Sequence, residues 1–195
     1  MIDTVLGYQL ATISFLLFVL LGAFDGIYFH MIKYRLFAHP PARFEHQLHT
    51  FRGILFIPIT LIFFVWNSVG LLLWLGLLLL FIDFIAEIID IIVEKAARAQ
   101  LGGISPVESV IHITATGFRM AALAIILVLK PSGAFALQAV TCEFPPLPTY
   151  LHYIGLSFTI GLVLALLVQL SQMYFPTLGR LLVASECLLR KPQSE

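Results

Sequence analysis

Long apolar segments without a charged residue constrain this chain more than any other feature. The segment from Thr4 to Phe24 carries no charge, and neither does the segment from Gly53 to Ile82. A helix that crosses a bilayer needs about 20 predominantly apolar residues. Hydrophobic residues make up 60% of the 195 residues and charged residues 11%, whereas soluble domains contain roughly 25% charged residues. A soluble core could not bury so much apolar surface, so the sequence predicts an all-α integral membrane protein.

Five transmembrane helices follow from these segments and from the residues that interrupt them. The stretch Asn67–Gly70 divides the longer segment into two helices, each of which must include the charged residues beside it. The pair Gly102–Gly103 suits a helix C-cap, and Ser105-Pro106 followed by Glu108 is typical of a helix start. We expect helices at about 4–33, 41–66, 71–97, 105–129 and 150–175, with an amphipathic surface helix at about 177–190. The first four should form a four-helix bundle that encloses a polar site, with the fifth helix peripheral, in one domain covering residues 1–195.

The basic residues predict the orientation of these helices. Lys130 marks one side alone, and the other side carries Lys33, Arg35, Arg43, Lys95, Arg98, Arg180, Arg190 and Lys191. By the positive-inside rule we expect the N-terminus outside and the C-terminus in the cytoplasm, in a bacterial inner membrane. The net charge is zero, which argues against a nucleic-acid partner. The expected partners are the lipid bilayer, because the helices are apolar, and a lipid-soluble substrate. A homo-oligomer is left open.

Ionisable residues inside the expected helices are the most informative part of the sequence. Seven of the eleven acidic residues and four of the six histidines lie within the first four helices. An ionisable group in hydrocarbon costs a few kcal/mol or more, so such groups face the interior and find partners there. Counted at about 1.5 Å per residue from the helix ends, they fall in one slab of the cytoplasmic half of the bilayer.

Helical spacing places many of these side chains on shared faces. The four acidic residues of the third helix stand at i, i+4, i+7 and i+11, within an arc of about 60°. The Glu-x3-His pairs at 45–49 and 108–112 each share a face of the second and the fourth helix. In the first helix Asp25 and His30 are about 140° apart, so a straight α-helix aims only one of them at the site. The expected depth of Asp25 in the bilayer favours it as the residue that faces the site.

This pattern resembles the ligand arrangement of dimetal sites in four-helix bundles, although soluble members use Glu-x2-His rather than Glu-x3-His. The mixture of oxygen and imidazole ligands favours two divalent ions of iron, zinc or manganese, and the shortage of thiolates argues against copper(I) or an iron–sulfur cluster. The predicted metal ligands are Asp25, Glu45, His49, Asp83, Glu87, Asp90, Glu108 and His112. The residues predicted to support or replace them are His30, His46, Arg52, Glu94 and Arg119, with the two arginines as counter-ions of buried carboxylates and Glu94 also able to pair with Arg98.

A weak internal repeat appears when Glu45-x3-His49 is aligned with Glu108-x3-His112. Each half then consists of a helix with a carboxylate, a cytoplasmic turn and a helix that opens with Glu-x3-His. Both halves would cross the membrane in the same sense. The alignment predicts a pseudo-two-fold axis along the membrane normal.

Three classes of function fit such a site. The favoured one is a dimetal enzyme acting on a quinone, fatty acyl or isoprenoid group, with redox chemistry ahead of hydrolysis because no His-Glu-x2-His stretch is present. The second is a transporter or sensor of metal ions or protons, which the apolar outer halves of the helices disfavour. The third is a haem b cytochrome with His49 and His112 as axial ligands, less favoured because haem does not need the surplus carboxylates. The catalytic residues themselves are not identified by the sequence.

Overall fold

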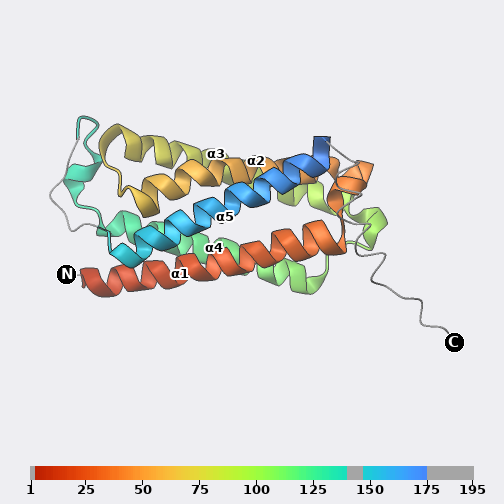
Figure 1. The fold of residues 1–195 in the computed structure, drawn as a ribbon, viewed down its shortest axis with the longest axis horizontal. Helices are drawn as coiled ribbons and strands as arrows, with labels where there is room; N and C mark the ends of the chain where they lie inside the picture. Colours follow the sequence, from red (N-terminus) through yellow and green to blue (C-terminus); the bar gives the residue numbers. More distant parts are fainter. Residues whose placement is uncertain (1–2, 140–146, 175–195) are drawn as a thin grey trace.

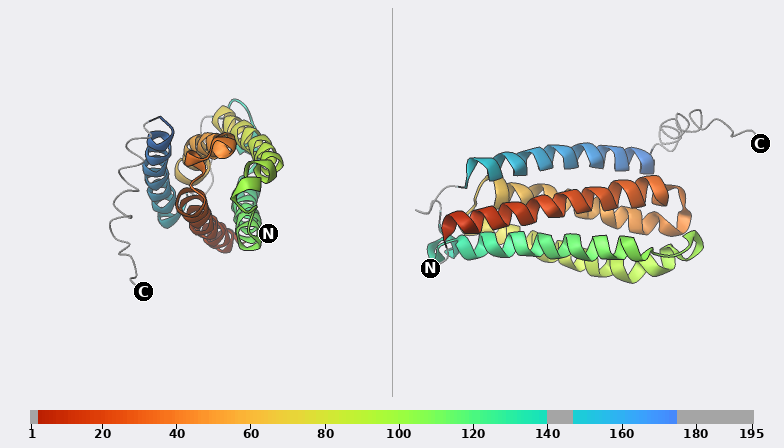
Figure 2. Two further views of the ribbon diagram at one scale, coloured as in Figure 1. Left: turned by 90° about the vertical axis from the view of Figure 1, so that its right-hand side faces the viewer. Right: turned by 90° about the horizontal axis from the view of Figure 1, so that it is seen from below.

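The chain is all-helical in the residues that the structure describes, 3–139 and 147–174 of a computed structural model. Five long helices run side by side along one axis (Figures 1 and 2). They are α1 (Thr4–Phe24) with its π-helical continuation η1 (Asp25–Lys33), α2 (Arg43–Thr60) with its π-helical continuation η4 (Leu61–Val65), α3 (Gly70–Ala97), α4 (Pro106–Leu129) and α5 (Thr149–Tyr174). Short 3₁₀ turns connect them at Leu36–Ala38, Pro40–Ala42, Ala99–Leu101 and Ser132–Phe135.

These bounds confirm the five expected helices to within a few residues, and all five are long and apolar enough to span a membrane. The predicted surface helix at about 177–190 lies outside the described residues. The expected N-cap is also present, since the Ser105 hydroxyl accepts a hydrogen bond from the backbone N–H of Glu108 at 3.1 Å. The expected glycine C-cap lies one short turn later than predicted, because α3 ends with Arg98 as its C-cap and Gly102, at a positive φ angle, caps the 3₁₀ turn Ala99–Leu101 that follows.

Helix packing divides the molecule lengthwise into an apolar end and a polar end. α1 packs against α4, α2 packs against α3, and α5 lies against α2 and η4 on one flank, as the end-on view of Figure 2 shows. The apolar core lies at the end that holds the N-terminus, where Phe15 stacks on Phe64 at 4.1 Å between ring centroids and meets Phe158 edge-on at 5.4 Å. The charged side chains of the first four helices lie beyond this core, towards the other end.

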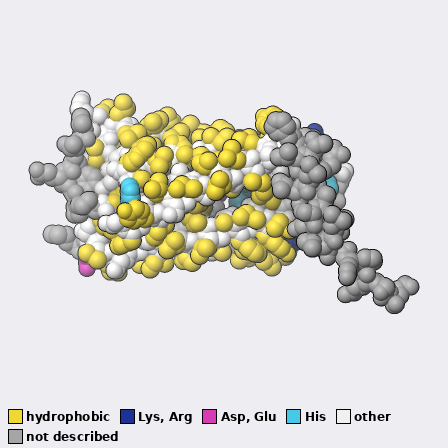
Figure 3. Space-filling model, in the orientation of Figure 1, with side chains coloured by type: hydrophobic (Ala, Val, Ile, Leu, Met, Phe, Trp, Pro, Cys, Tyr) yellow, Lys and Arg dark blue, Asp and Glu magenta, His cyan; other side chains and the backbone are white. Residues whose placement is uncertain are grey.

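The outer surface is apolar over the length of the helices. Leu71, Ile92 and Ile113 are each at least 70% exposed, and large hydrophobic side chains on all five long helices are exposed as well. Figure 3 shows hydrophobic side chains over the middle of one face, with Lys and Arg side chains near one end. Contiguous apolar surface of this extent is unfavourable in water and suits contact with lipid chains.

The first helix departs from the expected straight α-helix at its charged end. From Asp25 to Lys33 the backbone is π-helical, in which each N–H bonds to the carbonyl five residues earlier, as the N–H of Tyr34 does to Phe29 at 2.9 Å. A π-helical turn holds more residues than an α-helical one, so residues five apart come close to sharing a face. Asp25 and His30 are both buried, at 6% and 3% exposed. The prediction that only one of them faces inward assumed a straight α-helix, and the π-helix removes that restriction.

Close packing of α3 against η4 depends on Gly76. A Cβ atom at Gly76 would lie 2.7 Å from Ile62 and 2.8 Å from the Phe63 ring, whereas a Cβ at Gly117 on α4 would meet no described atom within 4 Å. We predict that Gly76→Leu lowers the free energy of unfolding by about 1–3 kcal/mol through overpacking. The matched variant Gly117→Leu should unfold at or above the wild-type temperature, because leucine favours helix over glycine. Thermal unfolding in detergent measures both, and equal stabilities of the two variants would contradict the packing.

Candidate metal centre

Six carboxylates from four helices are buried together at the polar end. Each is at most 6% exposed, and together they are Asp25, Glu45, Asp83, Glu87, Asp90 and Glu108. The side chain of Glu94 is 17% exposed and lies at their edge. Burial of carboxylates is costly unless each finds positive charge or hydrogen bonds. The positive charges and hydrogen bonds that offset these buried carboxylates therefore define the site.

Arg98 compensates the carboxylates nearest the helix ends. It follows α3 and is fully buried, and its guanidinium donates to Glu45 at 2.5 and 2.8 Å and to Glu108 at 2.6 Å. It also lies 3.5 Å from Glu94, which confirms the pairing expected one helical turn apart. The Tyr34 ring covers the guanidinium at 4.7 Å. Burial by itself lowers the pKa of Arg98, but the hydrogen bonds and charges of Glu45 and Glu108 outweigh burial and raise this pKa above its usual value.

Arg52 and Arg119 compensate the carboxylates of α3 that lie deeper. Arg52 contacts Asp83 and Glu87 at 3.1 Å each and lies 3.6 Å from Asp90. Arg119 from α4 binds the second oxygen of both Asp83 and Glu87. The hydroxyl of Thr116 donates to Glu87 at 2.7 Å. The two arginines are thus counter-ions of buried carboxylates, as predicted.

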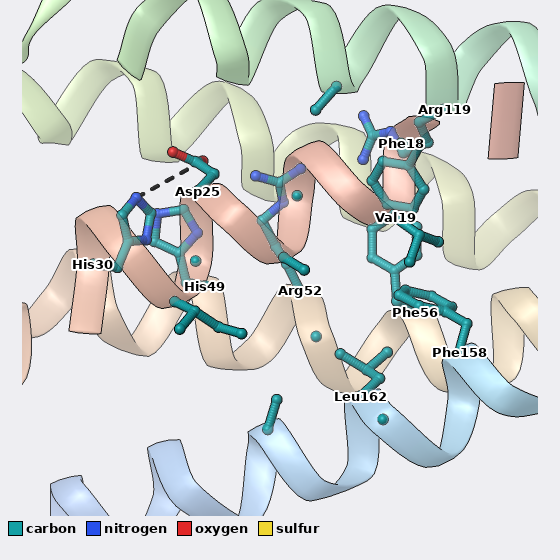
Figure 4. Close-up of a pocket in the computed structure, with 18 of the residues that line it drawn as sticks. Phe18, Val19, Asp25, His30, His49, Arg52, Phe56, Arg119, Phe158 and Leu162 are labelled. Atoms are coloured by element: carbon teal, nitrogen blue, oxygen red, sulfur yellow. Dashed lines mark ion pairs between the residues drawn. The ribbon is translucent and has the colours of Figure 1, made fainter. Parts of the chain in front are cut away.

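Between these two arginine clusters lies a layer of histidines and carboxylates. Nδ1 of His112 lies 3.2 Å from Asp25, and Nε2 of His49 lies 3.2 Å from Asp90. The rings of His30 and His49 are 4.0 Å apart between centroids. Nε2 of His30 lies 3.8 Å from Glu108 and 3.9 Å from Asp25, the second of which is drawn in Figure 4.

These contacts follow the internal repeat suggested by the sequence. His112 of α4 pairs with Asp25 at the α1–η1 junction, and His49 of α2 pairs with Asp90 of α3. The helix pairs correspond in the same way, since α1 packs on α4 as α3 packs on α2. Glu45 and Glu108 both bind the single guanidinium of Arg98. These contacts match between the two halves of the repeat, as a two-fold axis would require, and Arg98 binds one carboxylate from each half.

Several polar atoms of the layer have no hydrogen-bond partner in the described part of the chain. They are one oxygen each of Asp25, Asp90 and Glu108, and Nε2 of His112. Buried polar atoms without a partner are rare in stable structures and are typical of positions that bind a ligand, an ion or a water molecule. Two groups of three residues also bring one ligand atom each to within 4.8 Å of the others; they are His30, Glu45 and His49, and Asp25, His30 and Glu108.

The predicted site residues therefore converge, with differences in detail. Arg52 and Arg119 bind both carboxylate oxygens of Asp83 and of Glu87, so these two residues take no part in the proposed ligand sets. Asp90 and His112 also lie outside both groups of three, but each is 3.2 Å from a member of one group, Asp90 from His49 and His112 from Asp25. His46 is buried beside the Phe37 ring, outside the ion-pair network. His30 belongs to both ligand groups, although helical facing favoured Asp25 over it.

Sequence reasoning predicted the pairing of Arg98 with Glu94 but missed the contacts of Arg98 with Glu45 and Glu108. Its spacing of four from Glu94 was the available signal, but the contacts with Glu45 and Glu108 join distant parts of the chain. Thr116 was missed as well. Its spacing of four from His112 places it on the face that carries the site.

A cavity of about 710 Å³ adjoins this layer. It lies among α1, η1, α2, α4 and α5 and has a polar end and an apolar end (Figure 4). Asp25, His30, His49 and His112 line the polar end, and the apolar end is formed by side chains that include Phe18, Phe56, Phe158 and Leu162. Arg52 and Arg119 line the cavity between them. An apolar pocket with a few convergent polar groups is typical of a binding site for a small molecule.

No protein-family model, curated protein or solved structure matches this chain. A functional assignment therefore depends on the geometry and chemistry of the site itself.

Arg98 should be essential to stability because it compensates two buried carboxylates at once. We predict that Arg98→Met costs about 3–5 kcal/mol of unfolding free energy, since it leaves Glu45 and Glu108 buried without a counter-ion. Adding Glu45→Gln and Glu108→Gln should recover most of this loss. Lys95→Met, at an exposed position on α3, is the matched control and should unfold like wild type. Denaturant unfolding in detergent measures all four proteins, and no recovery in the triple variant would contradict the charge argument.

Proposed function

We propose that the protein is an integral membrane metalloprotein whose first four helices form a bundle around two divalent metal ions. The observation that carries this proposal is the set of buried carboxylate oxygens without hydrogen-bond partners in the described chain, one each on Asp25, Asp90 and Glu108, beside the imidazoles of His30, His49 and His112. Atoms of these types are the ligands that iron, zinc and manganese bind in proteins.

Charge balance supports the number of ions. Seven carboxylates, with Glu94 included, share the site with three guanidinium groups, which leaves four negative charges while the histidines are neutral. Two divalent cations would balance this excess. Metal binding also prefers the neutral form of histidine and the ionised form of a carboxylate.

Distances support two sets of ligands related by the internal repeat. Ligand atoms that bind one ion at about 2.0–2.2 Å lie roughly 3–3.5 Å from each other. His49 and Asp90 are 3.2 Å apart, as are His112 and Asp25. With Glu45 added to the first pair and Glu108 to the second, each ion would have one imidazole and two carboxylates, and a neutral His30 could complete only one set at a time.

The cavity supports an enzyme that acts on a lipid-soluble substrate. Its polar end is formed by residues of the ligand sets and its apolar end suits a quinone, fatty acyl or isoprenoid group. We place redox chemistry ahead of hydrolysis. In the stretch from Glu45 to His49 only these two residues face the centre, because His46 packs beside Phe37, so the stretch does not supply the paired histidines of a zinc hydrolase.

Metal content tests the proposal directly. We predict about two ions per chain in protein purified without chelator, measured by elemental analysis together with an absorption spectrum. His49→Ala and His112→Ala should each lose roughly one ion, because each removes the imidazole of one set. His152→Ala is the matched control, since His152 contacts the Val65 carbonyl at the opposite end of the helices.

The possible outcomes separate the functional classes. Iron without a haem spectrum supports a redox enzyme, and zinc supports a hydrolase. A haem spectrum would replace the dimetal centre by a cytochrome. Wild-type protein without metal above background would overturn the proposal and favour a proton or ion relay among the same carboxylates and histidines.

Membrane orientation is a separate part of the proposal, with the polar end in the cytoplasmic half of a bacterial inner membrane. Lys95 is exposed near this end, and Leu137 is 59% exposed in the connection between α4 and α5 at the other end. In a variant that lacks both native cysteines, we predict that Leu137→Cys reacts with a membrane-impermeant thiol reagent outside intact cells. Lys95→Cys should react only after permeabilisation. The reverse pattern would show the opposite orientation.

A further inference from the structure

The cavity opens sideways, through the flank between the first helix and α5. Six of its lining residues are also exposed on the molecular surface in the described part of the chain, among them Ala23 on the first helix and Ser157 on α5. Leu16 and Ile27 on the first helix are 37% and 49% exposed, Tyr153 on α5 is 61% exposed, and Gly161 on α5 is exposed as well. Residues that line a cavity and reach the surface mark its mouth. This mouth lies on the apolar flank of the helices rather than at their ends.

The polar end of the cavity offers no free positive charge among the described residues. Both arginines that line it are already paired, Arg52 with three carboxylates of α3 and Arg119 with two of them. The two divalent ions proposed above would only balance the four excess negative charges of the site, so an anionic head group beside Asp25 would add a charge without a counter-ion. Placing such a charge in an apolar surrounding is strongly unfavourable.

The cavity wall, at this end and between the two ends, does offer hydrogen bonds to an uncharged group. Nε of Arg119 is buried without a hydrogen-bond partner in the described chain, and so is Nε2 of His112. Both residues line the cavity. The Arg119 N–H can donate only, whereas the imidazole nitrogen can donate or accept according to its tautomer. A carbonyl or hydroxyl oxygen is the group that such a pair can satisfy.

We infer that the cavity binds an uncharged lipid, in which a carbonyl or hydroxyl head group is attached to a long hydrocarbon chain. The head lies at the histidine layer, the chain lies along Phe56, Phe158 and Leu162, and the lipid enters from the bilayer between α1 and α5. This inference rests on the proposed function and names the substrate class of the same centre. A quinone and a long-chain alcohol share this chemistry, and a fatty acid anion does not.

Two glycines in the cavity wall allow a test that leaves the metal centre intact. A Cβ atom at Gly161 on α5 would meet no described atom within 4 Å, and one at Gly22 on α1 would lie at an ordinary 3.7 Å from Phe18. Leucine at either position would fill cavity space without a backbone clash. Gly117 on α4 is equally open but does not line the cavity, so Gly117→Leu is the matched control.

The experiment measures equilibrium binding of three probes to the purified full chain in lipid nanodiscs, with metal content determined on the same samples. The probes are decylubiquinone, hexadecanol and palmitate. We expect at least one of the two neutral probes to bind wild type and Gly117→Leu alike, with palmitate roughly tenfold or more weaker. The preferred neutral probe distinguishes a quinone-like substrate from an alcohol-like one. Gly161→Leu and Gly22→Leu should weaken neutral binding roughly tenfold or more while metal content stays at the wild-type level.

Three results would overturn the inference. They are no binding of either neutral probe, binding of palmitate as tight as that of the neutral probes, or unchanged neutral binding in both leucine variants. Each of these leaves the metal content of wild type untouched, so it would leave the proposed metal centre standing. Conversely, wild type that binds a neutral probe but contains no metal would support the cavity and overturn the metal centre.

Discussion

Seven carboxylates share one end of a helix assembly whose outer surface is almost entirely apolar. In such surroundings a charge is tolerated only when its partners are fixed in place, because water cannot replace a missing one. Every helix that contributes a carboxylate is therefore tied to another helix by it: α2 and α4 through Arg98, α3 and α4 through Arg119, and α2 and α3 through Arg52. The first helix is tied to α4 through Asp25 and His112. The positions of the helices at the polar end follow from these pairings.

The two ends of the molecule hold the helices together by different means. At the N-terminal end, aromatic and aliphatic side chains such as Phe15 and Phe64 interlock, and small residues such as Gly76 allow close approach. Packing of this kind is the main source of helix association in lipid, where the hydrophobic effect between helices is weak. Close packing at the apolar end can offset the local loss of stability at the polar end, where buried polar atoms without hydrogen-bond partners and a cavity occur in the described residues.

Spacing and composition were sufficient to predict the five helices, the buried carboxylates and the counter-ion roles of Arg52 and Arg119. These features follow from the length of the apolar segments and from the free-energy cost of a charge in hydrocarbon, and both can be judged from the local sequence. The π-helix at Asp25–Lys33 could not be predicted, because sequences that form π-helical hydrogen bonds differ little from sequences that form α-helical ones. The burial of Arg98 could not be predicted either, since its partners Glu45 and Glu108 come from helices whose relative placement the sequence does not state.

The order of the charged layers explains where chemistry can occur. A guanidinium carries a fixed positive charge, whereas histidines and carboxylates can exchange protons and metal ions. The fixed charges of Arg98 lie on one side of the histidine layer, and those of Arg52 and Arg119 lie on the other. Asp25, His30, His49 and His112 lie between them and line the cavity. The histidines and Asp25 are thereby the groups of variable charge that a molecule in the cavity would touch, while the arginine clusters on both sides tie the helices together.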